Sequence, residues 1–333
     1  MKPKVLVTGP LHASGHDLLR AAVLIEGDVE KPMRREDVLS MLSGKDGLVV
    51  ASPLKVDAAL MDLARELKVV STNSVGYDHI DVAEATRRGI YVCNTPGVLT
   101  DCVAETTWAL ILAVAKRLVE GDRFVRSGRW DRPLTSVEFL GSDLRGKTLG
   151  IIGLGRIGKR VAEVARCFGL RVLYYDTVRS ELHERMGVVY RELSELLKEA
   201  DIVTLHVPLK SDTYHMVDAS KICMMKKGAI LINTSRGAVV DERALVEALR
   251  DGRIAAAGLD VFEEEPISKE SELVKLENVV LSPHRGSASV ETRMAMAELV
   301  ARNLISVLKG VMPPALVNPE VLNVRSLEEV KML

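Results

Sequence analysis

Apolar residues recur along this chain in two patterns, short unbroken runs and longer stretches in which every third or fourth position is apolar. Regular alternation of the two patterns is typical of βαβ units, in which helices cover both faces of a parallel sheet. The first part of the chain predicts strands at 4–7, 48–50, 69–71 and 90–92, with helices over 56–67 and 81–88. Further strands are predicted at 149–152, 171–175, 202–206, 229–232, 255–259 and 279–282. We therefore predict an α/β protein built on two series of strands.

Two long helical patterns join these series, one over residues 101–118 and the other over 287–308. No strand series follows the second helix, so the economical architecture is two doubly wound parallel-sheet domains, one inserted into the other. The predicted boundaries are 1–98 with 289–333 for the outer domain and 99–288 for the inserted domain. We expect the substrate to bind in the cleft between the two domains.

A glycine-rich segment, Gly153–Gly158, follows the predicted strand at 149–152 and opens a helical pattern. In a dinucleotide site the first glycine permits a tight turn, the second lets the backbone approach a pyrophosphate, and the third packs helix on strand. The next predicted strand ends on Asp176, which is placed to accept hydrogen bonds from an adenosine ribose. Because its charge would repel a 2′-phosphate, NAD is favoured over NADP, although Arg179 lies close enough in sequence to meet such a phosphate. The alternative is a glycine turn in an α/β unit that binds no nucleotide.

The inserted domain is thus predicted to be a Rossmann NAD-binding domain, and the outer one a flavodoxin-like substrate domain. Composition agrees with two cores, since 47% of the 333 residues are hydrophobic and 27% are charged. The net charge of −1 gives no general attraction to nucleic acid or to an anionic membrane. The four cysteines contain no CxxC pair, so reduced thiols are expected, with neither a disulfide nor a metal site. The N-terminal apolar run is too short for a signal peptide, which predicts a cytoplasmic protein.

Polar residues that follow the later strands indicate a reaction. Ligands bind beyond the carboxyl ends of parallel strands, and Arg236, Glu265 and His284 all fall there. Reducing a carbonyl with hydride requires a proton donor, which predicts His284 as acid/base, with Glu265 orienting its ring. Arg236 would bind a substrate carboxylate through its planar guanidinium. Taken singly, each residue also fits a structural role, as a core histidine, a surface ion pair or part of a solvated acidic run.

Short motifs are spread over nearly the whole chain, namely Val75–Asp78, Asn94–Gly97, Gly153–Gly158, His206–Leu209, Thr234–Gly237, Gly258–Phe262, Glu265–Pro266 and Ser282–His284. Through these segments the chain resembles the D-isomer-specific 2-hydroxyacid dehydrogenases. Within the family it is most similar to the archaeal-type glyoxylate/hydroxypyruvate reductases, through Phe124–Gly128, Phe262–Pro266 and Met296–Val300. One departure is Arg285, where many relatives have an apolar residue.

The resemblance implies the same catalytic residues, Arg236, Glu265 and His284, and a substrate carboxylate held by backbone amides at Val75 and Gly76. The substrate-binding residues expected are Leu54, Val75, Gly76, Arg236 and His284. The cofactor-binding residues expected from the motif and the resemblance are Gly153, Leu154, Gly155, Arg156, Ile157, Gly158, Asp176, Val207, Pro208, Thr234, Ser235, Asp260 and Gly286. Family members are usually dimers that pair through the segment between about 119 and 147, so a homodimer is expected.

The expected reaction interconverts a small 2-oxo acid, glyoxylate or hydroxypyruvate, and its D-2-hydroxy acid with NAD(H). D-3-phosphoglycerate dehydrogenase is the alternative enzyme. The substrate segments Ser52–Leu54 and Val75–Gly76 carry no cluster of cations for a phosphate, which argues against it. We also expect no additional regulatory domain of the kind that many phosphoglycerate dehydrogenases carry. A further alternative is a non-enzymatic, NAD-sensing protein like the corepressors related to this family, although those usually have extended termini and none are expected here.

Overall fold

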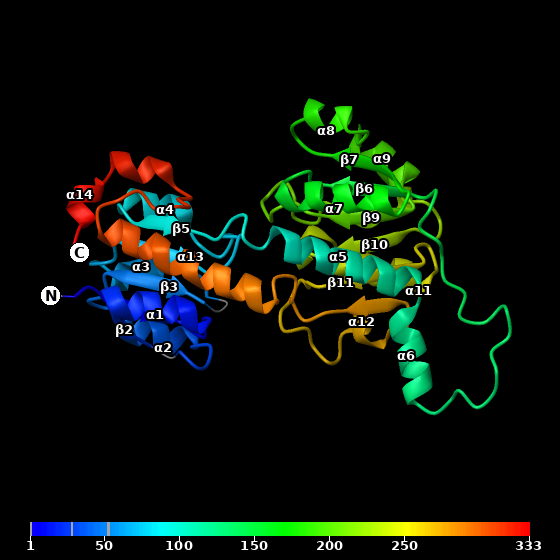
Figure 1. Ribbon diagram of the computed structural model, residues 1–333, viewed down its shortest axis with the longest axis horizontal. Coiled ribbons are helices and arrows are strands. Elements are labelled where there is room, and N and C mark those ends of the chain that lie inside the picture. Colours follow the sequence, from blue (N-terminus) through cyan, green and yellow to red (C-terminus); the bar gives the residue numbers. More distant parts are fainter. Residues whose placement is uncertain (1, 28, 52–53) are drawn as a thin grey trace. The chain divides into compact units, whose positions relative to one another are not determined.

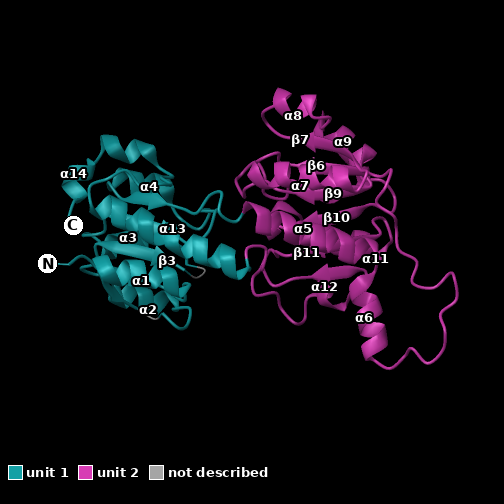
Figure 2. Cartoon of the chain, in the orientation of Figure 1, with its two compact units in different colours: residues 1–99, 288–333 teal, residues 100–287 magenta. Residues whose placement is uncertain are grey.

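The computed structural model describes residues 2–27, 29–51 and 54–333. They form two compact units, one from residues 1–99 and 288–333 and the other from residues 100–287 (Figure 2). Each unit contains one wholly parallel sheet with helices on both faces, which confirms the predicted α/β class (Figure 1). None of the helices formed by the described residues is long and apolar enough to cross a membrane.

The first unit has a five-stranded sheet in the order β2-β1-β3-β4-β5. Its strands are β1 (Lys4–Val7), β2 (Leu24–Glu26), β3 (Gly47–Val50), β4 (Val69–Thr72) and β5 (Tyr91–Cys93). Its helices are α1 (Ala13–Ala22), α2 (Arg35–Met41), α3 (Ala58–Leu63), α4 (Val82–Arg87), α13 (Val290–Leu308), α14 (Leu327–Val330) and a 3₁₀ turn, Pro319–Asn323. The strand order is that of flavodoxin-like folds.

Strand alternation divides the core of this unit into two layers. Val5 and Val7 pack with Leu19 of α1 and Val300 of α13 on one face of the sheet. Leu6 points to the opposite face, among apolar residues of α2, α3 and α4. Because successive side chains of a strand point to opposite faces, a strand buried on both sides must be apolar throughout, as these are.

The second unit has a seven-stranded sheet in the order β12-β11-β10-β9-β6-β7-β8. Its strands are β6 (Thr148–Ile152), β7 (Arg171–Tyr175), β8 (Val189–Tyr190), β9 (Ile202–Leu205), β10 (Ile230–Asn233), β11 (Ala256–Leu259) and β12 (Val279–Leu281). Its helices are α5 (Thr100–Ala115), α6 (Leu118–Arg126), α7 (Arg156–Cys167), α8 (Glu181–Arg185), α9 (Leu193–Glu199), α10 (Ala219–Met224), α11 (Glu242–Arg250), α12 (Glu272–Lys275) and a 3₁₀ turn, Gly237–Val239. Helices α5 and α7 cover one face, and α9, α10 and α11 cover the other.

Several element predictions were wrong in detail. The helix predicted over 101–118 corresponds to α5 but ends at Ala115, and Arg117, in a left-handed conformation with φ 52°, separates it from α6, which begins at Leu118. The helix predicted over 56–67 is limited to α3. Strands β2 and β8 were missed, since both are short and lie at sheet edges. Edge strands of two or three residues carry too few apolar positions to show a period.

Candidate active site

The loops that follow the strands of the second unit all lie on one side of its sheet, at the carboxyl ends of the strands, which we call the carboxyl edge. The strand order places β6 between β7 and β9, so the chain reverses direction across the sheet at β6, where open α/β sheets bind ligands. A Cβ added to Gly153 would lie 2.7 Å from the carbonyl oxygen of His206. The glycine loop after β6 and the His206–Pro208 loop after β9 are therefore in direct contact.

The three motif glycines meet different constraints, and together they fit a dinucleotide. Gly153 has φ +94°, a conformation that L side chains rarely adopt. A Cβ on Gly158 would overlap the carbonyl oxygen of Gly153, so this glycine packs α7 against the turn. A Cβ on Gly155 would meet nothing within 4 Å. Gly155 is also the N-cap of α7, and no side chain caps the first backbone N–H groups of that helix. These N–H groups therefore face open space, where they can attract a phosphate.

Asp176 is joined to the glycine loop by a hydrogen bond. The backbone N–H of Leu154 donates to Asp176 Oδ2 at 2.7 Å, while Oδ1 accepts a longer bond from Thr177. The carboxylate is therefore held beside the start of α7. Arg179, the cation that could favour a 2′-phosphate, donates to Glu184 at 2.9 Å and lies over the ring of Tyr190.

His284 and Glu265 form a hydrogen-bonded pair at the same sheet edge. His284 Nδ1 lies 2.6 Å from Glu265 Oε2. Burial raises the pKa of Glu265, but the hydrogen bond from His284 and the positive charges of His284 and Arg236 outweigh it, so the pKa lies below the usual value. An ionised carboxylate only accepts hydrogen bonds, so Nδ1 carries the proton of this bond. The pairing leaves Nε2 as the ring nitrogen for chemistry, and 49% of the His284 side chain is exposed.

Asp260 organises the turn that carries His284. Its carboxylate is buried and accepts hydrogen bonds from Ser282 Oγ and from the backbone N–H groups of Arg285 and Gly286. The backbone N–H of His284 donates to Asp260 O at 2.8 Å. These bonds hold His284 at φ 50°, in the left-handed region. Sequence reasoning assigned Asp260 to the cofactor, and the structure adds this contact with the histidine turn.

The loop after β10 places Arg236 beside the Glu265 segment. Asn233 accepts from the Ser235 N–H and donates to the Arg236 carbonyl, which fixes the turn. A Cβ on Gly237 would overlap the backbone of Phe262, so the two loops touch without side chains between them. The motif contained Gly237, but the candidate residues did not include it. Its packing role depends on a contact that sequence alone does not reveal.

Helix α5 supplies further groups that the sequence did not indicate. Thr107 Oγ1 lies 2.9 Å from Thr234 Oγ1, and Thr106 Oγ1 donates to the Gly286 carbonyl at 3.3 Å. Both predicted cofactor residues, Thr234 and Gly286, are therefore fixed by α5. The helical pattern at 101–118 indicated only an apolar helix that covers the sheet. The two hydrogen bonds became visible only from the position of the first two turns of α5 in the structure.

The predicted carboxylate-binding segment lies in the first unit, after β4. Asn94 Nδ2 donates to Val75 O at 2.8 Å, and Ser74 Oγ donates to Gly76 O at 2.5 Å. Neither the Val75 nor the Gly76 backbone N–H has a hydrogen-bond partner among the described residues. Two successive amides without partners, with both carbonyls engaged, are suited to an anion. Leu54 is buried in the apolar core, 4% exposed, and the predicted Ser52 and Pro53 lie outside the described residues.

Comparison with known proteins assigns the family. The NAD binding domain of D-isomer specific 2-hydroxyacid dehydrogenases matches residues 108–286. The chain is 51% identical to a glyoxylate reductase of Thermofilum pendens, covering 100% of this chain and 99% of the relative. A solved protein of Thermus thermophilus has a TM-score of 0.89 and 44% identity, with 94% of this chain and 99% of that one covered.

A second solved relative adds information on the cofactor. It is an NADPH-dependent glyoxylate/hydroxypyruvate reductase of Sinorhizobium meliloti in complex with NADP and malonate, with a TM-score of 0.86 and 35% identity. The alignment covers 96% of this chain and 98% of the relative. The resemblance predicted from sequence motifs is confirmed. The chain belongs to the D-isomer specific 2-hydroxyacid dehydrogenase family and is an oxidoreductase with a domain for a nicotinamide cofactor.

Proposed function

We propose that this enzyme uses NADH to reduce a small 2-oxo acid, glyoxylate or hydroxypyruvate, to the D-2-hydroxy acid. The observation that carries the proposal is the His284–Glu265 pair, 2.6 Å apart, on the sheet edge that holds the glycine loop and Arg236. Glyoxylate reductases at about half identity over the whole chain support the substrate class. Residues 99–288 would be the cofactor domain, and 1–98 with 289–333 the substrate domain.

In this proposal each residue has one task. The nicotinamide, when bound, supplies the hydride. His284 holds on Nε2 the proton that the substrate oxygen takes, and Glu265 accepts from Nδ1, which orients the ring. Arg236 aligns the substrate through its planar guanidinium. The amides of Val75 and Gly76 bind the substrate carboxylate.

A substrate panel tests the proposal. Purified enzyme is mixed with NADH and glyoxylate, hydroxypyruvate, pyruvate or phosphohydroxypyruvate, and the loss of NADH absorbance is followed. We expect the highest kcat/KM with glyoxylate or hydroxypyruvate. A preference for phosphohydroxypyruvate would instead identify a phosphoglycerate dehydrogenase. Absence of oxidation with every 2-oxo acid would overturn the enzymatic proposal and favour an NAD-sensing role.

We further propose that Asp176 makes NADH the preferred cofactor. Its carboxylate would accept from the ribose hydroxyl of NADH and repel the 2′-phosphate of NADPH. Asp176→Asn removes the charge but keeps an oxygen that can accept from the Leu154 N–H. The cofactor preference is kcat/KM with NADH divided by kcat/KM with NADPH. We expect it to fall by roughly tenfold or more in this variant, since a hydrogen bond to a charged group contributes about 1.5–3 kcal/mol.

A preference for NADPH is the competing result, because the Sinorhizobium meliloti relative is NADPH-dependent. Steady-state kinetics of the unmodified enzyme with both cofactors give the starting ratio. A wild-type enzyme that prefers NADPH, or an Asp176→Asn variant with an unchanged ratio, would contradict the role given to Asp176. Arg179→Ala is the companion variant, expected to leave NADH kinetics unchanged because Arg179 is engaged by Glu184 and Tyr190.

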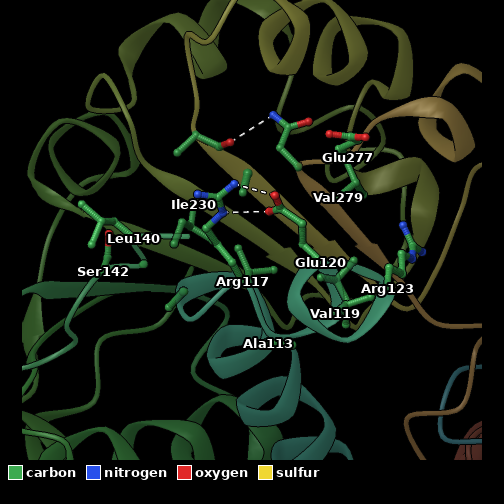
Figure 3. Close-up of a pocket in the computed structure, with 17 residues that line it drawn as sticks. Ala113, Arg117, Val119, Glu120, Arg123, Leu140, Ser142, Ile230, Glu277 and Val279 are labelled. Atoms are coloured by element: carbon green, nitrogen blue, oxygen red, sulfur yellow. Dashed lines mark hydrogen bonds and ion pairs between the residues drawn. The ribbon is translucent and has the colours of Figure 1, made fainter. Parts of the chain in front are cut away.

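We propose that two copies pair through the segment around α6. Exposed apolar side chains gather there, with exposed fractions of 51% for Val125, 58% for Trp130 and 74% for Val137. A cavity of about 400 Å³ adjoins α6 and the first residues of β10, β11 and β12, the sheet edge opposite to His284. Figure 3 shows the Arg117–Glu120 ion pair within it. We expect sedimentation to give a dimer for the wild type and a monomer for Trp130→Asp.

A further inference from the structure

We propose that His79, Thr72 and Ser74 form a directed hydrogen-bond chain that positions the Val75–Gly76 amides for the substrate carboxylate. Three contacts make the chain. His79 Nε2 lies 3.2 Å from Thr72 Oγ1, which lies 3.1 Å from Ser74 Oγ, which lies 2.5 Å from Gly76 O. All four residues belong to the first unit. The inference rests on the proposed function, since it concerns the segment that would bind the substrate.

The direction of every bond in this chain follows from counting protons. A carbonyl oxygen only accepts, so the single hydroxyl proton of Ser74 is donated to Gly76 O. Ser74 Oγ must then accept from Thr72, which uses the only proton of Thr72. Thr72 Oγ1 must in turn accept from His79, so His79 carries a proton on Nε2. The positions of four heavy atoms thus fix one tautomer of His79 and one orientation for both hydroxyls.

The hydrogen-bond chain holds the peptide plane that follows Gly76, and so limits the rotation of Gly76 about its own Cα that would turn the Gly76 N–H away. The peptide group is planar, so holding the Gly76 carbonyl fixes the plane shared with the N–H of Tyr77. Asn94 holds the preceding carbonyl, that of Val75, at 2.8 Å, and so fixes the plane that contains the Gly76 N–H. Thr72 is 1% exposed at the end of β4, which gives the chain a rigid origin in the sheet.

This arrangement predicts an effect on substrate affinity rather than on the cofactor. Breaking the chain would let the Gly76 carbonyl turn and would lower the fraction of protein in which the amides are ready for a carboxylate. The glycine loop and His284 lie in the other unit, so NADH binding should not change. His79, Thr72 and Ser74 are therefore positioning residues that act through Val75 and Gly76.

The test uses Ser74→Ala and Thr72→Val in the full-length enzyme. For both variants we expect the KM for the 2-oxo acid, and the inhibition constant of oxamate with NADH bound, to rise by about tenfold, since one hydrogen bond contributes roughly 0.5–1.5 kcal/mol. We expect kcat and the Kd for NADH to stay near the wild-type values. Ser74→Thr and Thr72→Ser retain the hydroxyl groups and should restore a low KM. If Thr72→Val does not fold, the comparison of Ser74→Ala with Ser74→Thr still tests the inference.

Two controls separate positioning from general stability. Ser71→Ala removes a buried hydrogen bond from the neighbouring residue of β4, where Ser71 Oγ donates to Val300 O on the other face of the sheet. It should lower Tm without raising KM. His79→Phe should also raise KM, and adding Thr72→Val to Ser74→Ala should raise KM no further than Ser74→Ala alone, because Ser74 is the member of the chain that holds Gly76 O.

The outcomes distinguish this inference from the proposed function. A wild-type enzyme that reduces no 2-oxo acid would overturn the proposed function itself. An active wild type with unchanged KM in Ser74→Ala would overturn the positioning role alone. Fully additive increases in KM for the Ser74→Ala and Thr72→Val variants would show two separate contacts in place of a chain.

Discussion

His284→Ala is expected to lower kcat by about 10²–10⁴-fold while leaving the affinity for NADH unchanged. A positioned general acid contributes an acceleration of that size, and the variant removes the only group proposed to protonate the substrate oxygen. The side chain is half exposed, and the turn that carries it is held by Asp260 through backbone bonds that the substitution does not touch. Steady-state kinetics measure kcat, and quenching of protein fluorescence by NADH measures cofactor binding.

A variant of Glu265 shows how much of the loss of kcat depends on the carboxylate that accepts from His284. Glu265→Gln keeps an oxygen that can accept from His284 Nδ1 but removes the carboxylate charge. We expect a smaller loss of kcat than for His284→Ala, because the ring and an acceptor for its Nδ1 proton both remain. Full turnover in His284→Ala would remove His284 from the mechanism. Loss of NADH binding in that variant would show that the residue supports the cofactor site instead.

Sequence reasoning succeeded where residue type and strand position coincide. The glycines, Asp176 and the groups after β10, β11 and β12 could be predicted to share an edge, because parallel strands all end on the same side of a sheet. The pairing of His284 with Glu265 followed from the same rule together with the known pKa range of histidine. These predictions need only the order of elements and the chemistry of single residues.

The features that the sequence did not reveal depend either on contacts between distant segments or on local backbone conformation that residue type does not determine. The bond between Thr107 and Thr234 joins residues 127 positions apart, and nothing in the helical pattern of α5 distinguishes Thr107 from its neighbours. The break between α5 and α6 depends on a left-handed Arg117, a residue with no intrinsic preference for that conformation. The hydrogen-bond chain from His79 to Gly76 requires the loop after β4 to fold back against the end of that strand, and hydrophobic periodicity does not encode this turn.

Gly237→Ala should lower kcat/KM by on the order of 10²-fold or more, although residue 237 contributes no functional group. An added Cβ would overlap the backbone carbonyl of Phe262, and backbone cannot turn aside as a side chain can. The loop bearing Arg236 and the segment that leads to Glu265 must then separate, and a shift of about 1 Å at a catalytic group is enough for such a loss. Gly121→Ala in α6, where the added Cβ meets nothing within 4 Å, is the matched control and should leave kcat/KM unchanged. Circular dichroism and NADH titration would show whether the Gly237 variant remains folded. If that variant is folded and fully active, the contact between the two loops does not set the position of Arg236.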